Sequence, residues 1–298
     1  MNIQIKFAIL AIIIVIPLSS IVVYGTDSNQ QFQKIESDKL QIISSFYPLH
    51  EFSQIIGQEK VDAILLVPIG VEPHDWEPTI KDVQQMQKSD LIIINGIGFE
   101  NWVDSLRENN YQGKIIDTSD KILVKKLDDN SKDPHIWLNP VTVKTQVQNI
   151  ANAFSDSDPE NQQYYQSNAA KYIEQLDLLD VKIRNELSQC NNDFIAFHDA
   201  FSYFADEYDL KQHTIISPNN SHGEATARTL ENIISTANTL NIKVIFSEEA
   251  VDPKTSEIIA NEIGGKVLIL SPIEIASDGN YISKMTENLK NLKVALCQ

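Results

Sequence analysis

The chain has 298 residues, of which 42% are hydrophobic and 22% are charged, so it is long enough for two ordinary domains or one large one with a hydrophobic core. Its 24 basic and 41 acidic residues give a net charge of −17, which argues against a surface built to neutralise nucleic-acid phosphates. We therefore expect a globular protein that does not bind nucleic acid. The negative charge is compatible with a cation as ligand, although it serves solubility equally well.

The N-terminal segment differs in composition from the rest of the chain. Lys6 precedes an uncharged run at 7–24, and residues 1–25 have the pattern of an export signal. Because that run is close to the ~18 residues that a membrane span needs, an uncleaved N-terminal anchor is the alternative. Either interpretation places the remainder of the chain outside the cytoplasm. Residues 26–38 are polar and without periodicity, which predicts a flexible tether.

Short apolar runs then alternate with helical patterns. We expect strands at 40–44, 61–67, 90–95 and 113–117 and amphipathic helices at 48–57, 79–87 and 99–109. This alternation predicts a mostly parallel sheet that is covered on both faces.

A long helical segment is predicted at 140–189. Asn139-Pro140 and Asp158-Pro159 each offer an N-cap residue followed by a first-turn proline. From 159 to 188, apolar residues recur every three or four positions, which predicts one amphipathic helix of about 30 residues and roughly 45 Å. The apolar positions are Tyr165, Ala169, Tyr172, Leu176, Leu179, Ile183 and Leu187.

The C-terminal part repeats the alternation of the first. We expect strands at 192–198, 213–217, 242–247 and 265–271 and helices at 199–208, 224–240, 253–264 and 281–296. The predicted fold class is therefore α/β, with two lobes at 39–139 and 190–298. Each lobe has a mostly parallel doubly wound sheet, and one long rigid helix joins them.

Cys190 and Cys297 are the two cysteines of the chain. In an oxidising compartment they can pair, and the bridge would fasten the C-terminal tail to its own lobe. The sequence leaves this pairing open.

Three histidines lie where an apolar, strand-like run gives way to a turn: His74, His135 and His198. Ligands of open α/β sheets bind beyond the carboxyl ends of the strands, so these imidazoles can converge there. Pro73 and Pro134 restrict the backbone just before two of them, which reduces the entropy lost when the rings are held in place. Converging imidazoles are typical of a Zn²⁺ site with one tetrahedral position left for a carboxylate or water.

Asp278, in the loop before the last helix, is the candidate for the fourth position. Glu248 and Glu249 at another strand end are rival carboxylates, and His222 in a turn-rich segment is a candidate auxiliary ligand. A water molecule is the remaining alternative.

The other ionisable residues have simpler interpretations. We expect His50 to be structural and His213 to lie away from the cleft. Asp75, Asp133 and Asp199 flank the three main histidines. Such carboxylates can fix the tautomer of a metal-bound imidazole, although capping of turns and helices is the commoner role.

The chain resembles a known family, the zinc- and manganese-binding solute-binding proteins of metal ABC importers, known as periplasmic solute-binding protein family 9 or cluster A-I. The resemblance runs from about residue 40 to residue 296. It rests on five ordered blocks: LVPIGVEPHDWEPT, DLIIINGIGFENWVD, DPHIWLNP, FIAFHDAFSYFADEYDL and KVIFSEEAVDPKTSEIIANEIGGKVLIL.

The resemblance implies two α/β lobes joined by a long helix, with metal held between the lobes. It places the first three ligands on His74, His135 and His198 and the fourth near Asp278. Histidine at the third position is similar to zinc-binding members, whereas manganese-binding members often have glutamate there. No histidine-rich loop precedes the DPHIW block, unlike in many zinc members.

The resulting hypothesis is a non-enzymatic, monomeric, extracytoplasmic receptor that captures a divalent transition metal and delivers it to the permease of an ABC importer. Zn²⁺ is favoured as ligand and Mn²⁺ is the alternative. A zinc hydrolase is the rival of another class, but no HExxH motif is present. A surface-scaffold or adhesion role on the same fold is a third alternative.

Overall fold

The computed structural model describes residues 39–108, 111, 113–127, 131–216, 225–249, 251–276 and 278–297. The predicted export segment at 1–25, the predicted tether at 26–38 and His222 lie outside the described residues. Among the residues that are described, no helix is long and apolar enough to cross a membrane.

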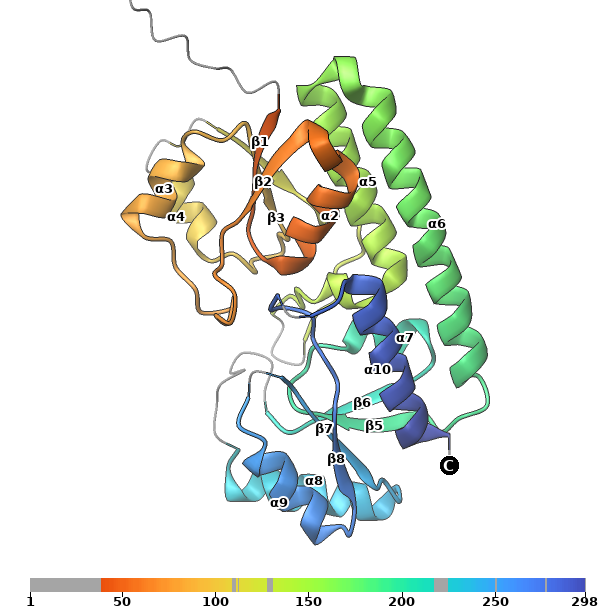
Figure 1. Ribbon diagram of the computed structural model, residues 1–298. Coiled ribbons are helices and arrows are strands. Elements are labelled where there is room, and N and C mark those ends of the chain that lie inside the picture. The colour runs from red at the N-terminus through yellow and green to blue at the C-terminus, as the bar shows by residue number, and fades with distance from the viewer. Residues whose placement is uncertain are drawn as a thin grey trace, which may run out of the picture. The chain divides into compact units, whose positions relative to one another are not determined.

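The first lobe is built on a parallel sheet of four strands in the order β2-β1-β3-β4. Its elements are β1 (Leu40–Ser44), α2 (Tyr47–Gly57), the 3-10 turn η1 (Gln58–Lys60), β2 (Val61–Leu65), α3 (Ile80–Met86), β3 (Leu91–Ile94), α4 (Trp102–Glu108) and β4 (Lys114–Asp117). Figure 1 shows α3 and α4 on one side of this sheet and α2 and α5 (Pro140–Ser157) on the other.

Alternation along the central strands explains why both faces of the first sheet are covered. Ile42 and Ile93 belong to the cluster that includes Phe52 of α2 and Val147 of α5. Their neighbours point the opposite way, so Ile43 joins a second cluster with residues of α3 and α4. Such two-sided burial is what parallel sheets require.

The second lobe repeats this arrangement with a parallel sheet in the order β6-β5-β7-β8. Its elements are β5 (Asp193–Ala196), α7 (Ser202–Glu207), β6 (Lys211–Thr214), α8 (Ala227–Thr239), β7 (Val244–Ser247), α9 (Lys254–Glu262), β8 (Lys266–Ile269) and α10 (Tyr281–Leu296). Ile195 and Ile245 pack with residues of α8 and α9, whereas Phe194 and Phe246 share a cluster with α10. The predicted fold class of two parallel-sheet α/β lobes is confirmed.

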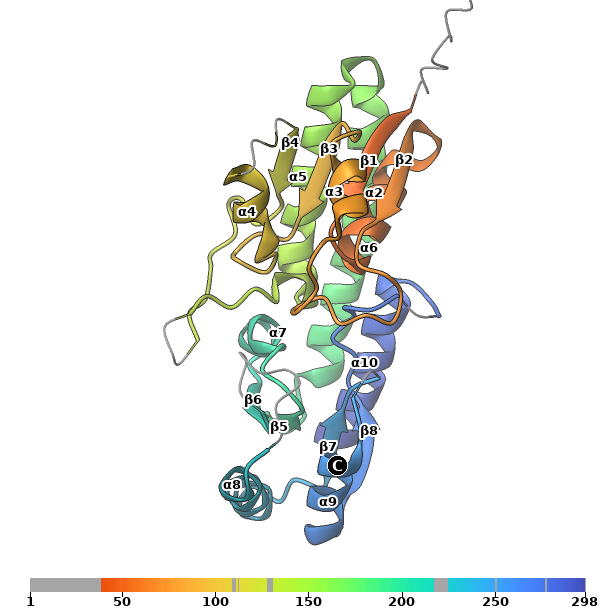
Figure 2. The same ribbon diagram turned by 90° about the vertical axis from the view of Figure 1, so that its left-hand side faces the viewer.

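Two helices connect the lobes. Asn139 accepts a hydrogen bond from the Val141 amide and Pro140 occupies the first turn, so α5 starts where the sequence predicts. After the 3-10 turn η3 (Pro159–Asn161), α6 runs from Gln162 to Leu187, and all seven predicted apolar positions are buried. The two helices lie side by side in both views (Figures 1 and 2).

Helix α6 is in contact with both lobes. It packs against α2 of the first lobe and α10 of the second. Arg184 of α6 pairs with Glu207 at the end of α7, and the hydroxyl of Tyr208 donates to Asp180. A single rigid helix therefore supports both sheets.

Cys190 and Cys297 form a disulfide with their Cα atoms 4.4 Å apart. The amide of Asn191 donates to the Leu296 carbonyl 2.9 Å away, so a backbone hydrogen bond joins the same two segments. The bridge fastens the end of α10 to the segment that links α6 with β5. The pairing that the sequence leaves open is present.

We predict that replacing both cysteines by alanine lowers the free energy of unfolding by about 2–4 kcal/mol, because the bridge closes a long loop and restricts the unfolded chain. The two residues are 107 positions apart. Buried Leu289, Leu292 and Leu296 keep α10 in place, so the variant should still fold. Urea denaturation of oxidised, reduced and substituted protein measures the difference. Equal midpoints for all three would contradict the prediction.

Candidate metal centre

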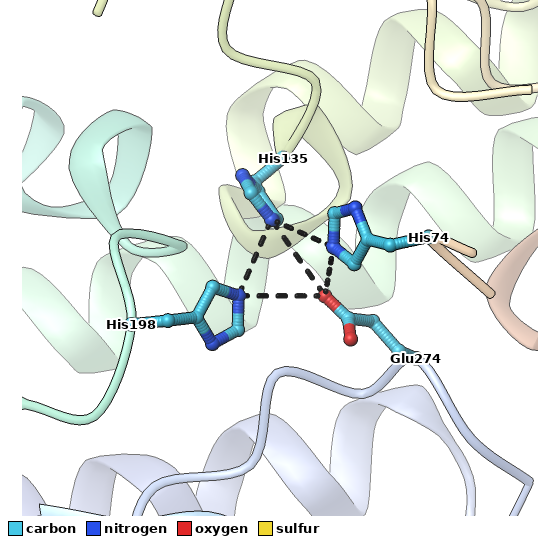
Figure 3. A group of neighbouring side chains, drawn as sticks. All are labelled: His74, His135, His198 and Glu274. Carbon is cyan, nitrogen blue, oxygen red and sulfur yellow. Dashed lines mark hydrogen bonds and ion pairs between the residues drawn. The ribbon is translucent and has the colours of Figure 1, made fainter. Parts of the chain in front are cut away.

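Four side chains converge from the carboxyl ends of four strands (Figure 3). His74 lies in the loop after β2, and His135 lies further along the segment that follows β4. His198 comes directly after β5, and Glu274 follows β8. Each lobe therefore contributes two of the four side chains, from the edge of its sheet where ligands of this fold class bind.

The donor atoms of the group face one another. The Nε2 atom of His135 is 3.3 Å from that of His74 and 3.4 Å from that of His198. The Oε1 atom of Glu274 is 3.4, 3.7 and 3.8 Å from the three imidazole nitrogens. All four donor atoms lie within 4.8 Å of one another.

These separations can be compared with a tetrahedral zinc shell. Ligands at ~2.0–2.1 Å from a central ion are about 3.3–3.4 Å apart along each tetrahedral edge. Five of the six separations, at 3.3–3.8 Å, are close to that value, and the sixth, between His74 and His198, is within 4.8 Å. The group thus fits a four-coordinate divalent cation, and only small movements would complete the shell.

The group is deeply buried. The relative exposures of His135, His198 and Glu274 are 1%, 1% and 3%, whereas the side chain of His74 is 17% exposed. The ring of Phe99 packs on His74 and that of Trp137 on His135. His74 is therefore the most exposed member of the group.

Carboxylates hold the second nitrogen of two of the rings. Nδ1 of His135 is 2.8 Å from Asp133 Oδ1, and Nδ1 of His198 is 2.6 Å from Glu248 Oε1. Acceptors at these positions place the proton on Nδ1, so each Nε2 lone pair points towards the centre of the group. The imidazoles are thereby oriented for metal binding.

The ionisable side chains of the group shift one another's pKa. Burial alone would raise the pKa of the Glu274 carboxyl, but the surrounding imidazoles, led by His74, lower it to about 2. Burial likewise opposes protonation of His198, but Glu248 and then Glu274 outweigh it and raise its pKa to about 9. For His135 burial prevails over Asp133, and its pKa is lowered. The group is a site that attracts positive charge, either protons or a cation.

Glu274 is presented by a constrained segment. The preceding residue, Ile273, is buried and has φ 56°, which is unfavourable for a β-branched residue. The indole of Trp137 donates to the Pro272 carbonyl at 2.8 Å, and the Ser271 amide donates to Asn288 at 2.8 Å. These bonds maintain the strained turn and direct the carboxylate towards the histidines.

A buried polar network supports the segment that leads to His135. Glu100 accepts hydrogen bonds from Ser45 and from the amides of Asn95 and Gly96. The side chain of Asn95 in turn donates to the Pro134 carbonyl at 2.8 Å. The carboxylate of Glu100 thus fixes the loop after β3, and that loop fixes the backbone just before His135.

The structure brings His74, His135 and His198 together as the sequence predicts, but the fourth member of the group is Glu274 and not Asp278. The side chain of Asp278 is exposed and lies outside the group. Asp278 falls in the polar turn before α10, where the chain has already returned to the surface. Glu274 is nearer the end of β8, and its apolar neighbours Ile273 and Ile275 are the sequence signal for a buried carboxylate.

The other candidates have different roles. Glu248 faces the far side of the His198 ring, and Glu249 binds Ser271 and Lys284. Of the flanking aspartates, Asp133 binds an imidazole, whereas Asp75 is exposed.

The two remaining described histidines lie outside the group. Nε2 of His213 in β6 lies 2.7 Å from Oδ1 of Asp193. His50 is half-buried on α2.

Two parallel-sheet lobes that each contribute two side chains to one buried group able to hold a metal are the arrangement of a metal-binding solute-binding protein. Residues 42–295 match the family described as zinc-uptake complex component A, periplasmic, and the chain belongs to this family.

A relative in Bacillus subtilis (strain 168), the high-affinity zinc uptake system protein ZnuA, is 34% identical over 91% of this chain and 92% of its own length. A crystal structure of ZnuA superposes with a TM-score of 0.80 at 32% identity, covering 87% of this chain and 99% of that one. Zn(II)-bound AdcA from Streptococcus pneumoniae superposes with a TM-score of 0.78 at 32% identity over 87% of this chain. This chain spans only 58% of that protein's length.

Proposed function

We propose that this protein captures Zn²⁺ outside the cytoplasm through His74, His135, His198 and Glu274 and delivers it to the permease of an ABC importer. The observation that carries the proposal is the convergence of three imidazole nitrogens and one carboxylate oxygen within 4.8 Å. Zinc is the cargo here, so the site must bind it tightly and also release it.

The donor set favours zinc over manganese. Neutral imidazole nitrogen suits Zn²⁺, whereas Mn²⁺ prefers sites richer in carboxylate and water oxygen. The zinc-uptake relative and the Zn(II)-bound neighbour support the same choice.

Four donors from the protein also favour capture over catalysis. Structural and storage sites for zinc close the tetrahedral shell with protein ligands, whereas catalytic sites keep one position for water or substrate. Three of the four side chains here are at most 3% exposed, which leaves little access for an organic substrate. We therefore propose a receptor and not a hydrolase.

The proposed location and partner rest on the sequence and the family. Residues 1–25 have the pattern of an export signal or membrane anchor, and the matching family is periplasmic. We propose that the protein acts as a monomer and that the membrane permease of a zinc importer is its partner. Loss of zinc uptake on deletion of the gene, restored by the intact gene, would support this role over a surface-scaffold role.

We predict that Glu274→Ala weakens zinc binding more than about 100-fold, because removal of a ligand costs more than the 10–100-fold typical of outer-shell changes. The matched control is Asp278→Ala, which removes an exposed carboxyl four positions along the same segment and should change the Kd less than about twofold. Competition titration against a chelator measures both, and circular dichroism checks the fold. Loss of affinity in Asp278→Ala with retention in Glu274→Ala would assign the fourth ligand to Asp278 instead.

We also predict that Glu248→Gln weakens zinc binding about tenfold, since it removes the charge that orients and strengthens the His198 imidazole. The control is its neighbour, Glu249→Gln, because Glu249 contacts Ser271 and Lys284 instead of a histidine. Isothermal titration with Zn²⁺ at one pH compares them. If the two variants bound zinc equally well, Glu248 would have no positioning role.

A further inference from the structure

Two sets of contacts join the lobes on either side of the metal centre. The first, here called the α7 latch, consists of Lys125, Asp133, Ser202, Tyr203 and Asp206. The second, here called the α10 joint, consists of Glu51, Trp137, Pro272 and Tyr281. The latch is polar and includes an exposed ion pair, whereas the joint is buried and contains two large aromatic side chains.

The α7 latch ties the segment before His135 to helix α7. The hydroxyl of Tyr203 accepts from the Lys125 amide and donates to the Asp133 carbonyl, each at 2.9 Å. The ammonium of Lys125 lies 2.6 Å from the Asp206 carboxylate and donates to the Ser202 carbonyl at 2.9 Å. The Asp133 amide donates to the Lys125 carbonyl, so the two first-lobe residues of the latch are also bonded to each other.

The latch is directly connected to two of the histidines. One oxygen of Asp133 lies against Nδ1 of His135, and the other accepts a hydrogen bond from the Ser202 hydroxyl. Helix α7 begins four residues after His198, and Gln212 fixes that link by binding the His198 carbonyl and the Phe201 amide. Separating α7 from Asp133 would therefore draw His198 away from His135.

The α10 joint is buried and largely aromatic. Trp137 donates to the Pro272 carbonyl, and the Tyr281 hydroxyl donates to the Trp137 carbonyl, each at 2.8 Å. Both carboxylate oxygens of Glu51 lie 2.9 Å from the Tyr281 amide. Trp137 and Tyr281 are fully buried, so opening this side would expose two large aromatic side chains to water.

The latch is the weaker of the two connections. Asp133 and Tyr203 are buried, but the Lys125 and Asp206 side chains at the edge of the latch are 28% and 70% exposed, and exposed ion pairs contribute little to stability. Water can replace the polar partners of the latch as it opens, whereas it cannot replace the aromatic packing of the joint. Opening at α7 with the α10 joint intact would keep Glu274 near His74 and separate His198 from His135.

We propose that the α7 latch sets the rate at which bound metal leaves, with the α10 joint acting as the hinge. The proposal rests on the proposed function, since it assigns the release step to contacts outside the ligand set. Tyr203 and Lys125 are positioning residues, because they act through His135 and His198 without touching the metal.

The test compares two tyrosine-to-phenylalanine variants, each of which removes one hydroxyl that bonds across the lobes. Tyr203→Phe removes the latch hydroxyl, and Tyr47→Phe removes the hydroxyl that donates to the Gly279 carbonyl near the joint at 3.1 Å. Zinc release from the loaded full chain into excess chelator is followed by stopped flow. Loss of the two latch bonds should accelerate release about fivefold in Tyr203→Phe, with less than about a twofold change in Tyr47→Phe.

Lys125→Met gives an independent check with its own control, Lys144→Met. Both lysines pair with one aspartate, at 2.6 and 2.7 Å, but Lys144 pairs with Asp177 between α5 and α6. Lys125→Met should accelerate release and Lys144→Met should not. The visible spectrum of the Co²⁺-loaded variants should match that of the wild type, because the four ligands are unchanged.

The outcomes separate the two proposals. If the unmodified protein fails to bind zinc, the proposed function fails. If it binds zinc but Tyr203→Phe and Lys125→Met release it at the unmodified rate, the latch is overturned while the function stands. Equal acceleration by Tyr203→Phe and Tyr47→Phe would also overturn it, because a general loss of interlobe contact would then suffice.

Discussion

The arrangement of this protein depends on four lone-pair-bearing atoms that lie within 4.8 Å of one another in a nearly dry space. Such a group is unstable by itself, because its donor atoms need either protons or a cation between them. Positive charge at the centre is balanced by the Glu274 carboxylate inside the group. Two more carboxylates, on Asp133 and Glu248, lie behind the imidazole rings. A cation placed at the centre would satisfy all four donors at once.

The two sheets position the loops that carry the four side chains. Parallel strands place their carboxyl ends at one edge, so the segments after β2 and β4 meet those after β5 and β8 across the lobe boundary. Helix α6 packs on both lobes and limits how far these edges can separate. The strain at Ile273 and the cross-lobe bond from Trp137 to Pro272 are local means of presenting Glu274 within that frame.

Much of this could be predicted from the sequence because the relevant patterns are local. Strand-end histidines and the apolar periodicity of 159–188 led to three members of the group and to α6. Glu274 is not predictable in this way, because burial of a carboxylate is a tertiary property and the turn residues next to Asp278 are the stronger local signal. Helix α4 starts later than expected because Glu100 binds the Asn95 and Gly96 amides and keeps its own segment in a loop. The disulfide cannot be predicted from the sequence, because it depends on where α10 lies relative to Cys190 in three dimensions.

Capture and delivery impose opposite demands on one site. Preorganised, buried ligands favour tight binding, while delivery requires a way to separate them without unfolding a lobe. The α7 latch and the α10 joint allow such a separation, since the polar latch can open while the aromatic joint stays packed. Affinity and release are then governed by different residues.

X-ray absorption at the zinc edge of the loaded protein tests the central claim most directly. We expect four light-atom ligands at about 2.0–2.1 Å, with scattering from three imidazole rings and one carboxylate oxygen. Five or six ligands at longer distances, or fewer than three imidazoles, would contradict it.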